Sequence, residues 1–221
     1  MSVTERELEL GHQFEDLEQQ TEAYTVGMWV FLVTEVLFFG ALFMAYIVYR
    51  SMYPQDFFAA SGELDIALGG LNTAILITSS LTMALAVRSA MLDRWKAQIG
   101  YILATMGFAF AFLVIKYFEY SSKFEHHLFP GEHFDFKGEN GEHAEMFFSL
   151  YFAMTGLHGI HVLVGILIMV ALVYRTWRMR AQRQDYIPIE LTGLYWHFVD
   201  IVWIFLYPLL YLIGPLGSGK G

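Results

Sequence analysis

Residues 195–203 read Tyr195-Trp196-His197-Phe198-Val199-Asp200-Ile201-Val202-Trp203 and place two ionisable side chains inside an apolar run. The surrounding segment, residues 191–213, has roughly the 20 apolar residues that a helix needs to cross a bilayer. His197 and Asp200 are three positions apart, so on a helix they share a face. Ionisable groups are costly at such a depth and usually face other helices or a polar path, which makes a functional role the default hypothesis.

The composition of the whole chain agrees with a membrane location. Of its 221 residues 56% are hydrophobic and 16% are charged, whereas a soluble domain carries about 25% charged residues. The absence of cysteine excludes disulfides, thiolate metal sites, iron–sulfur clusters and covalent c-type haem attachment. The formal net charge is -9, and basic residues gather in short loops beside apolar runs, which gives no support to nucleic-acid binding.

Five apolar runs predict five membrane-spanning helices, because each reaches about the 19-residue window expected of a span. They cover residues 24–49, 66–87, 97–115, 146–174 and 191–213. Each run is uninterrupted, unlike the alternation over about 10 residues of a membrane β-barrel strand. The predicted fold is therefore all-α: one five-helix transmembrane domain over residues 23–214, between an acidic segment 1–22 and a short tail 215–221.

Basic residues predict the orientation of this bundle. They follow the second and the fourth run, which puts both loops on one side: Arg88, Arg94 and Lys96, then Arg175, Arg178, Arg180 and Arg183. The positive-inside rule makes that side the cytoplasm, with the N-terminus cytoplasmic and the C-terminus periplasmic. The same four arginines, together with Trp196, are the candidates for contact with anionic phospholipid headgroups.

Glu35 lies in the middle of the first apolar run. Burial disfavours the carboxylate, so we expect the protonated acid unless a partner lies near. The functional interpretation is a carboxyl with a proton-linked role. The alternative is a neutral acid that hydrogen-bonds across a helix interface.

Three histidines lie in the fourth and fifth runs: His158, His161 and His197. Imidazole is a common metal ligand, but nothing in their spacing makes the three converge on one centre. We therefore expect them, with Asp200 and Glu119, to make polar contacts between helices, and we expect this chain to bind no haem or metal. Lys116, Glu119 and Lys123 are spaced to form ion pairs where the third helix leaves the membrane.

Two other classes of function would each require specific features in the sequence. A membrane hydrolase would use Ser79, Ser80 or Ser149 with a base in reach, but no Gly-x-Ser-x-Gly elbow occurs in the chain. A stand-alone proton-coupled carrier would use Glu35 and Asp200, and predicts internal repeats or helices broken at the midplane. Only Pro208 interrupts a span.

Motifs in four of the runs, and one that closes the third helix just after its run, resemble one family, subunit III of the haem–copper oxidases, most closely its cytochrome c oxidase form in the short five-helix bacterial version. In chain order they are Met28-Trp29-Val30-Phe31 with Glu35-Val36-Leu37-Phe38-Phe39-Gly40, Leu71-Asn72-Thr73-Ala74-Ile75-Leu76 with Ser79-Ser80, Glu119-Tyr120, Thr155-Gly156-Leu157-His158-Gly159-Ile160-His161-Val162-Leu163-Val164-Gly165, and residues 195–203. The resemblance covers almost all of residues 24–213.

This resemblance implies an accessory subunit of the aerobic respiratory chain in the bacterial inner membrane, without a redox centre of its own. It implies packing beside the catalytic subunit I, which holds the haems and copper, and beside subunit II, with respiratory supercomplexes as further partners. Bound phospholipid, support of proton uptake and protection during turnover are also implied. The third subunits of nitric oxide reductases and of quinol oxidases are alternatives within the same family.

Overall fold

The computed structural model describes residues 13–131, 134–136, 141–178 and 186–214. Six α-helices make up this part of the chain: α1 (Leu17–Met52), α2 (Pro54–Ser61), α3 (Ile66–Met91), α4 (Trp95–Glu125), α5 (Gly141–Arg178) and α6 (Ile187–Tyr211). All except α2 are long and apolar enough to cross a membrane. The prediction of an all-α fold with five spans is thus confirmed.

The short helix α2 was not predicted from the sequence. Its eight residues begin at Pro54, whose fixed φ suits the first turn of a helix. Phe57 and Ala60 are fully buried, and the Phe57 ring packs against Tyr46 of α1 and Phe147 of α5. An element of this length depends on such contacts with the rest of the fold, which hydropathy does not reveal.

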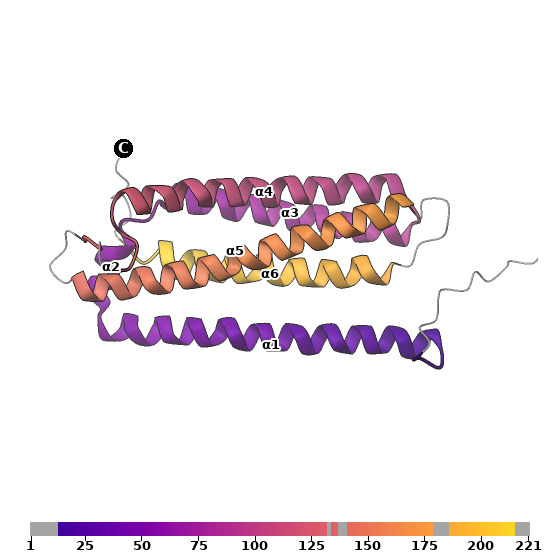
Figure 1. The fold of residues 1–221 in the computed structure, drawn as a ribbon, viewed down its shortest axis with the longest axis horizontal. Coiled ribbons are helices and arrows are strands. Elements are labelled where there is room, and N and C mark those ends of the chain that lie inside the picture. The colour runs from indigo at the N-terminus through magenta and orange to yellow at the C-terminus, as the bar shows by residue number, and fades with distance from the viewer. Residues whose placement is uncertain (1–12, 132–133, 137–140, 179–185, 215–221) are drawn as a thin grey trace, which may run out of the picture.

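The five long helices lie roughly along one axis (Figure 1), with α3 and α4 on one side, α5 and α6 in the middle and α1 on the other side. We call the end that carries α2 the α2 end. The opposite end is the basic end, because exposed basic residues gather there: Arg88, Arg94, Lys96, Arg175 and Arg178. Both predicted basic loops are therefore at the same end of the bundle.

Where α3 and α6 meet, α3 contributes small and hydroxyl-bearing residues and α6 contributes aromatic rings. The Trp203 indole donates to Thr73 Oγ1 over 3.1 Å, and the Trp196 indole donates to Ser79 Oγ over 3.1 Å. A Cβ added to Gly69 would lie 2.8 Å from the Tyr207 ring. Small residues thus let the large rings of α6 reach the α3 backbone.

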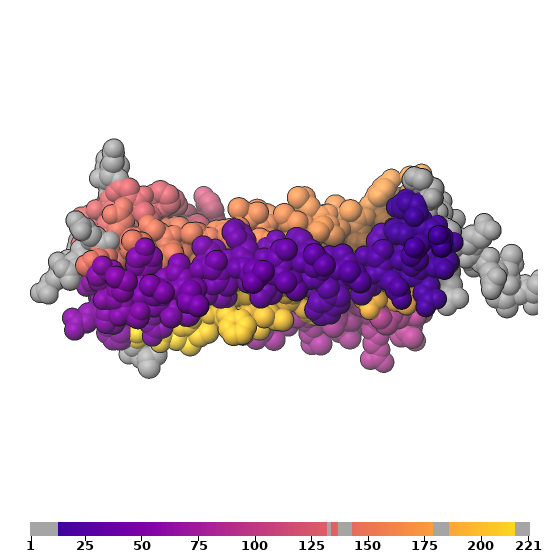
Figure 2. Space-filling view, turned by 90° about the horizontal axis from the view of Figure 1, so that it is seen from below, coloured from indigo at the N-terminus to yellow at the C-terminus, as the bar shows by residue number. Residues whose placement is uncertain are grey.

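The helix α1 begins at Leu17, so it extends back into the acidic segment 1–22. Its start is capped by Asp16, whose carboxylate accepts from the Gln19 N–H over 2.7 Å. Further along, α1 buries three residues, Leu32, Phe39 and Tyr46, at intervals of seven. This narrow seam leaves most of α1 on the surface of the bundle, as Figure 2 shows along one whole face.

Candidate functional site

Glu35 of α1 and His161 of α5 form a polar pair between two spanning helices. Glu35 Oε2 lies 3.1 Å from His161 Nε2, and the two side chains are 18% and 14% exposed. The Phe39 ring meets the imidazole edge-on, and the Tyr195 ring stacks against it. Glu35 therefore has a hydrogen-bonding partner, which the sequence alone could not show.

The hydrogen bonds of His161 show what this pair can do chemically. His161 Nδ1 lies 2.9 Å from the Leu157 carbonyl oxygen, which can only accept, so Nδ1 carries a proton. His161 Nε2 then either accepts a proton from the Glu35 acid or, in the imidazolium, donates to the Glu35 carboxylate. In both states one proton lies between the two groups and the pair is neutral. The pair can therefore pass a proton between Oε2 and Nε2 without placing a net charge in the membrane.

His197 and Asp200 of α6 both lie close to Ser80 of α3. Ser80 Oγ is hydrogen-bonded to His197 Nδ1 over 2.7 Å, and Asp200 is also beside the Ser80 hydroxyl. Asp200 is 2% exposed, and its two carboxyl oxygens have no hydrogen-bond partner among the described residues. The face that His197 and Asp200 share thus turns towards α3.

The Ser80–His197 contact does not make a nucleophile site. Ser80 lies inside α3, where the neighbouring backbone N–H groups take part in the hydrogen bonds of the helix. Acyl transfer needs free donors beside the nucleophile to stabilise the oxyanion. This part of α3 therefore does not favour the hydrolase alternative.

His158 is fully buried and packs between aromatic rings of two helices. Its ring centroid lies 5.4 Å from that of Phe112 on α4 and 5.2 Å from that of Trp203 on α6. Neither ring nitrogen has a hydrogen-bond partner in the described part of the chain. The three histidines thus have separate surroundings, and the described residues include no group of three or more His, Asp or Glu that could hold a metal.

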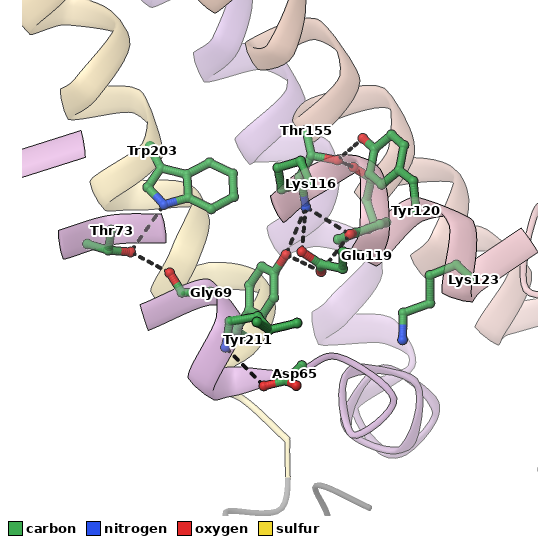
Figure 3. A network of polar contacts seen from close by, with 12 residues as sticks. Asp65, Gly69, Thr73, Lys116, Glu119, Tyr120, Lys123, Thr155, Trp203 and Tyr211 are labelled. Carbon is green, nitrogen blue, oxygen red and sulfur yellow. Dashed lines mark hydrogen bonds and ion pairs between the residues drawn. The ribbon is translucent and has the colours of Figure 1, made fainter. Parts of the chain in front are cut away.

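Glu119 belongs to a buried network, which we call the Lys116 network: Lys116, Glu119, Tyr151 and Tyr211. Figure 3 shows Lys116, Glu119 and Tyr211 of this network. Lys116 Nζ donates to Glu119 Oε2 over 3.1 Å, to Tyr151 Oη over 2.9 Å and to Tyr211 Oη over 3.0 Å. The hydroxyls of Tyr151 and Tyr211 in turn donate to Glu119 Oε1 over 2.8 and 2.5 Å.

The expected ion pair between Lys116 and Glu119 is present, but the expectation that it lies at the membrane surface is wrong. They are 6% and 4% exposed, and the ammonium lies over the rings of four aromatic residues, Tyr120, Tyr151, Trp203 and Tyr211. All three donors of the ammonium are used and both carboxylate oxygens accept, so burial leaves neither charge without partners. Lys123, the third member of the expected ladder, donates to the Glu63 carbonyl before α3.

Residues 8–215 match the family model of cytochrome c oxidase subunit III. The chain belongs to this family. The resemblance predicted from the motifs is thus confirmed, and the chain is an accessory subunit III of a terminal oxidase. It is consequently part of an oxidoreductase complex and a multi-pass membrane protein.

Named relatives within the family differ in the oxidase they come from. The chain is 36% identical to cytochrome c oxidase subunit 3 of Synechocystis sp., over 85% of this chain and 74% of the relative. It is 32% identical to cytochrome bo(3) ubiquinol oxidase subunit 3 of Pseudomonas aeruginosa, over 94% and 93%. It is also 32% identical to heme-copper oxidase subunit I+III of Aeropyrum pernix, over 85% of this chain and 22% of that relative.

The residues expected at lipid headgroups differ in their exposure. Arg175 and Arg178 are exposed at the basic end, where Arg178 Nη1 donates to Tyr174 Oη over 3.1 Å. Arg180 and Arg183 lie outside the described residues. The expectation is wrong for Trp196, which is fully buried and donates its indole N–H to Ser79. Its ring lies against Gly165 of α5 instead of facing lipid.

Sequence reasoning missed the two tyrosines of the Lys116 network. A signal was present on α5, where Tyr151, Thr155, His158 and His161 are spaced four, three and three residues apart. Such spacing puts all four side chains on one face of a helix. A polar stripe of this kind inside an apolar run predicts a line of interhelical polar contacts, with Tyr151 at its end.

Proposed function

We propose that this chain is the non-catalytic subunit III of a cytochrome c oxidase, packed against the subunit that holds the haems and copper, with subunit II in the same complex. The observation that carries the choice of partner is the relative from Aeropyrum pernix, in which subunits I and III form one polypeptide. Covalent joining of two subunits requires that they work in one assembly. In this proposal the phospholipid lies against the chain, and the haem and copper lie in the partner.

The test is purification of the complex from its native membrane in mild detergent through a tag on this chain. Haem and copper polypeptides in stoichiometric amounts, with oxygen reduction driven by reduced cytochrome c, are the expected result. Recovery of this chain without haem would overturn the proposal. Activity with quinol in place of cytochrome c would favour the second candidate, a quinol oxidase subunit III, which the Pseudomonas aeruginosa relative supports because it matches nearly end to end.

The stand-alone carrier finds no support in the helices. Carriers of that type bind their substrate where spanning helices are broken near the midplane. Here α6 remains helical through Pro208 to Tyr211, and the other four spans are each one continuous helix. The polar groups inside the bundle therefore lie on unbroken helices, as in a subunit that supports a neighbour.

The orientation in the proposal puts the basic end in the cytoplasm of a bacterium. Exposed Arg88, Arg94, Arg175 and Arg178 are at that end, whereas Lys116 and Lys123 towards the α2 end are buried. This asymmetry is what the positive-inside rule expects of a cytoplasmic face. The Glu35–His161 pair then lies inside the membrane, between the two faces.

Glu35→Gln should leave assembly and the initial rate of oxygen reduction nearly unchanged. The amide keeps a hydrogen bond to His161 but cannot exchange a proton with it. We expect any loss caused by Glu35→Gln to appear in proton uptake or in the activity that is retained during continued turnover. Both quantities are measured on the purified oxidase. Glu35→Ala, which leaves His161 Nε2 unpaired at a cost of about 1–3 kcal/mol, should also lower subunit retention. Immediate loss of oxygen reduction at normal subunit and haem content would show that Glu35 is catalytic.

Replacing Arg175, Arg178, Arg180 and Arg183 with glutamine should reduce the anionic phospholipid that stays with the purified oxidase. Each basic residue near an anionic surface contributes about 1 kcal/mol to that attraction. Lipid extraction followed by mass spectrometry measures the effect. Arg50→Gln, at the α2 end, is the matched control. The same lipid content in the fourfold variant and in Arg50→Gln would contradict the assignment.

A further inference from the structure

Midway along α6, one ionisable side chain lies at the outer surface of the bundle. His197 is near the middle of this helix and is only half-buried, whereas Asp200 on the same helix is 2% exposed. His197 Nδ1 is hydrogen-bonded over 2.7 Å to the hydroxyl of Ser80, which is near the middle of α3. This is the hydrogen bond that the imidazole makes within the described residues. One of its two ring nitrogens, Nε2, is therefore left for a neighbour outside this chain.

The side chains around His197 on this surface are apolar. Ile201 and Ile204 follow it at spacings of four and three, which puts all three on one face of α6, and they are 51% and 44% exposed. Ile77, three residues before Ser80 on α3, is 52% exposed. We call His197, Ile201, Ile204 and Ile77 the His197 face. Figure 2 shows part of α6, in yellow, uncovered beside α1.

A comparison with the Glu35–His161 pair shows how His197 differs. In the described part of the chain, these two are the other histidine or acidic side chains that are partly exposed midway along a span. Glu35 and His161 lie within hydrogen-bond distance of each other, and His161 Nδ1 donates to the Leu157 carbonyl. Both ring nitrogens of His161 thus have partners inside the subunit, whereas His197 has one bond, to a neutral hydroxyl.

The bilayer itself offers no partner to a histidine at this depth. A hydrocarbon core of about 30 Å puts the middle of a span about 15 Å from either headgroup layer, and acyl chains have neither donors nor acceptors. Ionisable residues within spans almost always face other protein or a polar cavity. We propose that the His197 face is the docking surface for a spanning helix of the haem-bearing subunit, and that this helix presents a hydroxyl, amide or carboxyl group to His197 Nε2.

A protein helix fits both parts of this surface. Helices associate in membranes through close apolar packing together with hydrogen bonds between polar side chains, and the His197 face offers isoleucines for the first and an imidazole for the second. The haem-bearing subunit is the partner because a relative from Aeropyrum pernix joins subunits I and III in one polypeptide. The identity of the partner rests on the proposed function, and the position of the contact goes beyond it.

Photochemical cross-linking in the native membrane tests the position of this contact. A photoreactive analogue, p-benzoylphenylalanine, replaces Phe205, which follows Ile204 on α6 and is 59% exposed. The matched control carries the same analogue in place of Phe110, which is 64% exposed near the middle of α4. After irradiation the oxidase is purified through a tag on this chain, and mass spectrometry identifies what has been cross-linked.

The expected result is a cross-link from position 205 to the haem-bearing polypeptide that is several-fold stronger than the one from position 110. Equal cross-linking from both positions would overturn the proposal. So would cross-links from position 205 to lipid alone, to a second copy of this chain or to a polypeptide without haem. The proposed function is judged separately, because it requires only that the haem polypeptide co-purifies with this chain, whatever position 205 contacts.

Two substitutions at His197 separate the contact with the partner from the contact with Ser80. The amide of asparagine reaches about as far as Nδ1, so His197→Asn keeps the bond to Ser80 and loses the bond at Nε2. The longer side chain of glutamine reaches the Nε2 position, so His197→Gln does the reverse. We expect the haem-bearing subunit to dissociate at a several-fold lower detergent concentration in His197→Asn than in His197→Gln. Equal retention or the opposite order would overturn the proposal, because His197 would then serve only the fold of this subunit.

Discussion

Replacing Lys116 with methionine should be among the most damaging single changes in this subunit, at about 3–5 kcal/mol. The substitution removes the ammonium that pairs with Glu119 and donates to the hydroxyl oxygens of Tyr151 and Tyr211. Glu119 then remains as a buried acid that has lost its paired cation. The measurement is the detergent concentration at which the subunit unfolds, together with the fraction of purified oxidase that retains it.

A matched control and a second variant distinguish the effect of breaking the buried ion pair from the effect of removing any lysine. Lys96→Met removes an exposed lysine from the same helix and should have little effect. The double variant Lys116→Met, Glu119→Leu removes both charges, so it should be less destabilised than the sum of the single variants. A Lys116→Met subunit as stable as Lys96→Met would show that the network is not what holds α4, α5 and α6 together.

Gly165→Val should have the next largest effect. A Cβ at this position would lie 2.6 and 2.8 Å from two atoms of the Trp196 ring and 3.4 Å from the Tyr195 ring. Trp196 cannot easily move away, because it is fully buried and its indole N–H is bound to Ser79. Overpacking of this kind costs about 1–3 kcal/mol and occasionally more. The same detergent titration measures it.

The control for Gly165→Val is Gly159→Val on the same helix, where an added Cβ meets nothing within 4 Å in this chain. Both changes share the lower helix propensity of valine, so their difference isolates the clash. Gly165→Val combined with Trp196→Phe removes the ring atoms that clash and should regain part of the loss. Equal stability of the two glycine variants would contradict the close α5–α6 contact.

The spans could be predicted from the sequence because hydropathy adds up over about 20 residues, and no single side chain decides the outcome. Helix ends were less predictable. The helix α5 begins at Gly141 and ends at Arg178, beyond the apolar run 146–174 at both ends. Polar residues can continue a helix outside the bilayer, and hydropathy alone does not show where that helix stops.

The polar residues could be predicted as buried, but their partners could not. Glu35 and His161 are 126 residues apart in the chain, so no local spacing relates them. Lys116 and Glu119 were instead expected at the surface, because they follow the end of the apolar run 97–115. What offsets the cost of burying this ion pair is the pair of hydroxyls from Tyr151 and Tyr211. These come from two later helices, and only the folded chain brings them to the lysine.

The buried residues of α1 have a consequence for the order in which the helices pack together while the chain is being synthesised. Phe39 contacts His161 and Phe198, and the Tyr46 hydroxyl donates to the Leu209 carbonyl over 2.8 Å. These partners belong to the two helices that are synthesised last. The first span therefore enters the bilayer early but waits there for its neighbours until nearly the whole chain has been made. Insertion and docking of the first span are thus separate events, and the last helix closes the bundle.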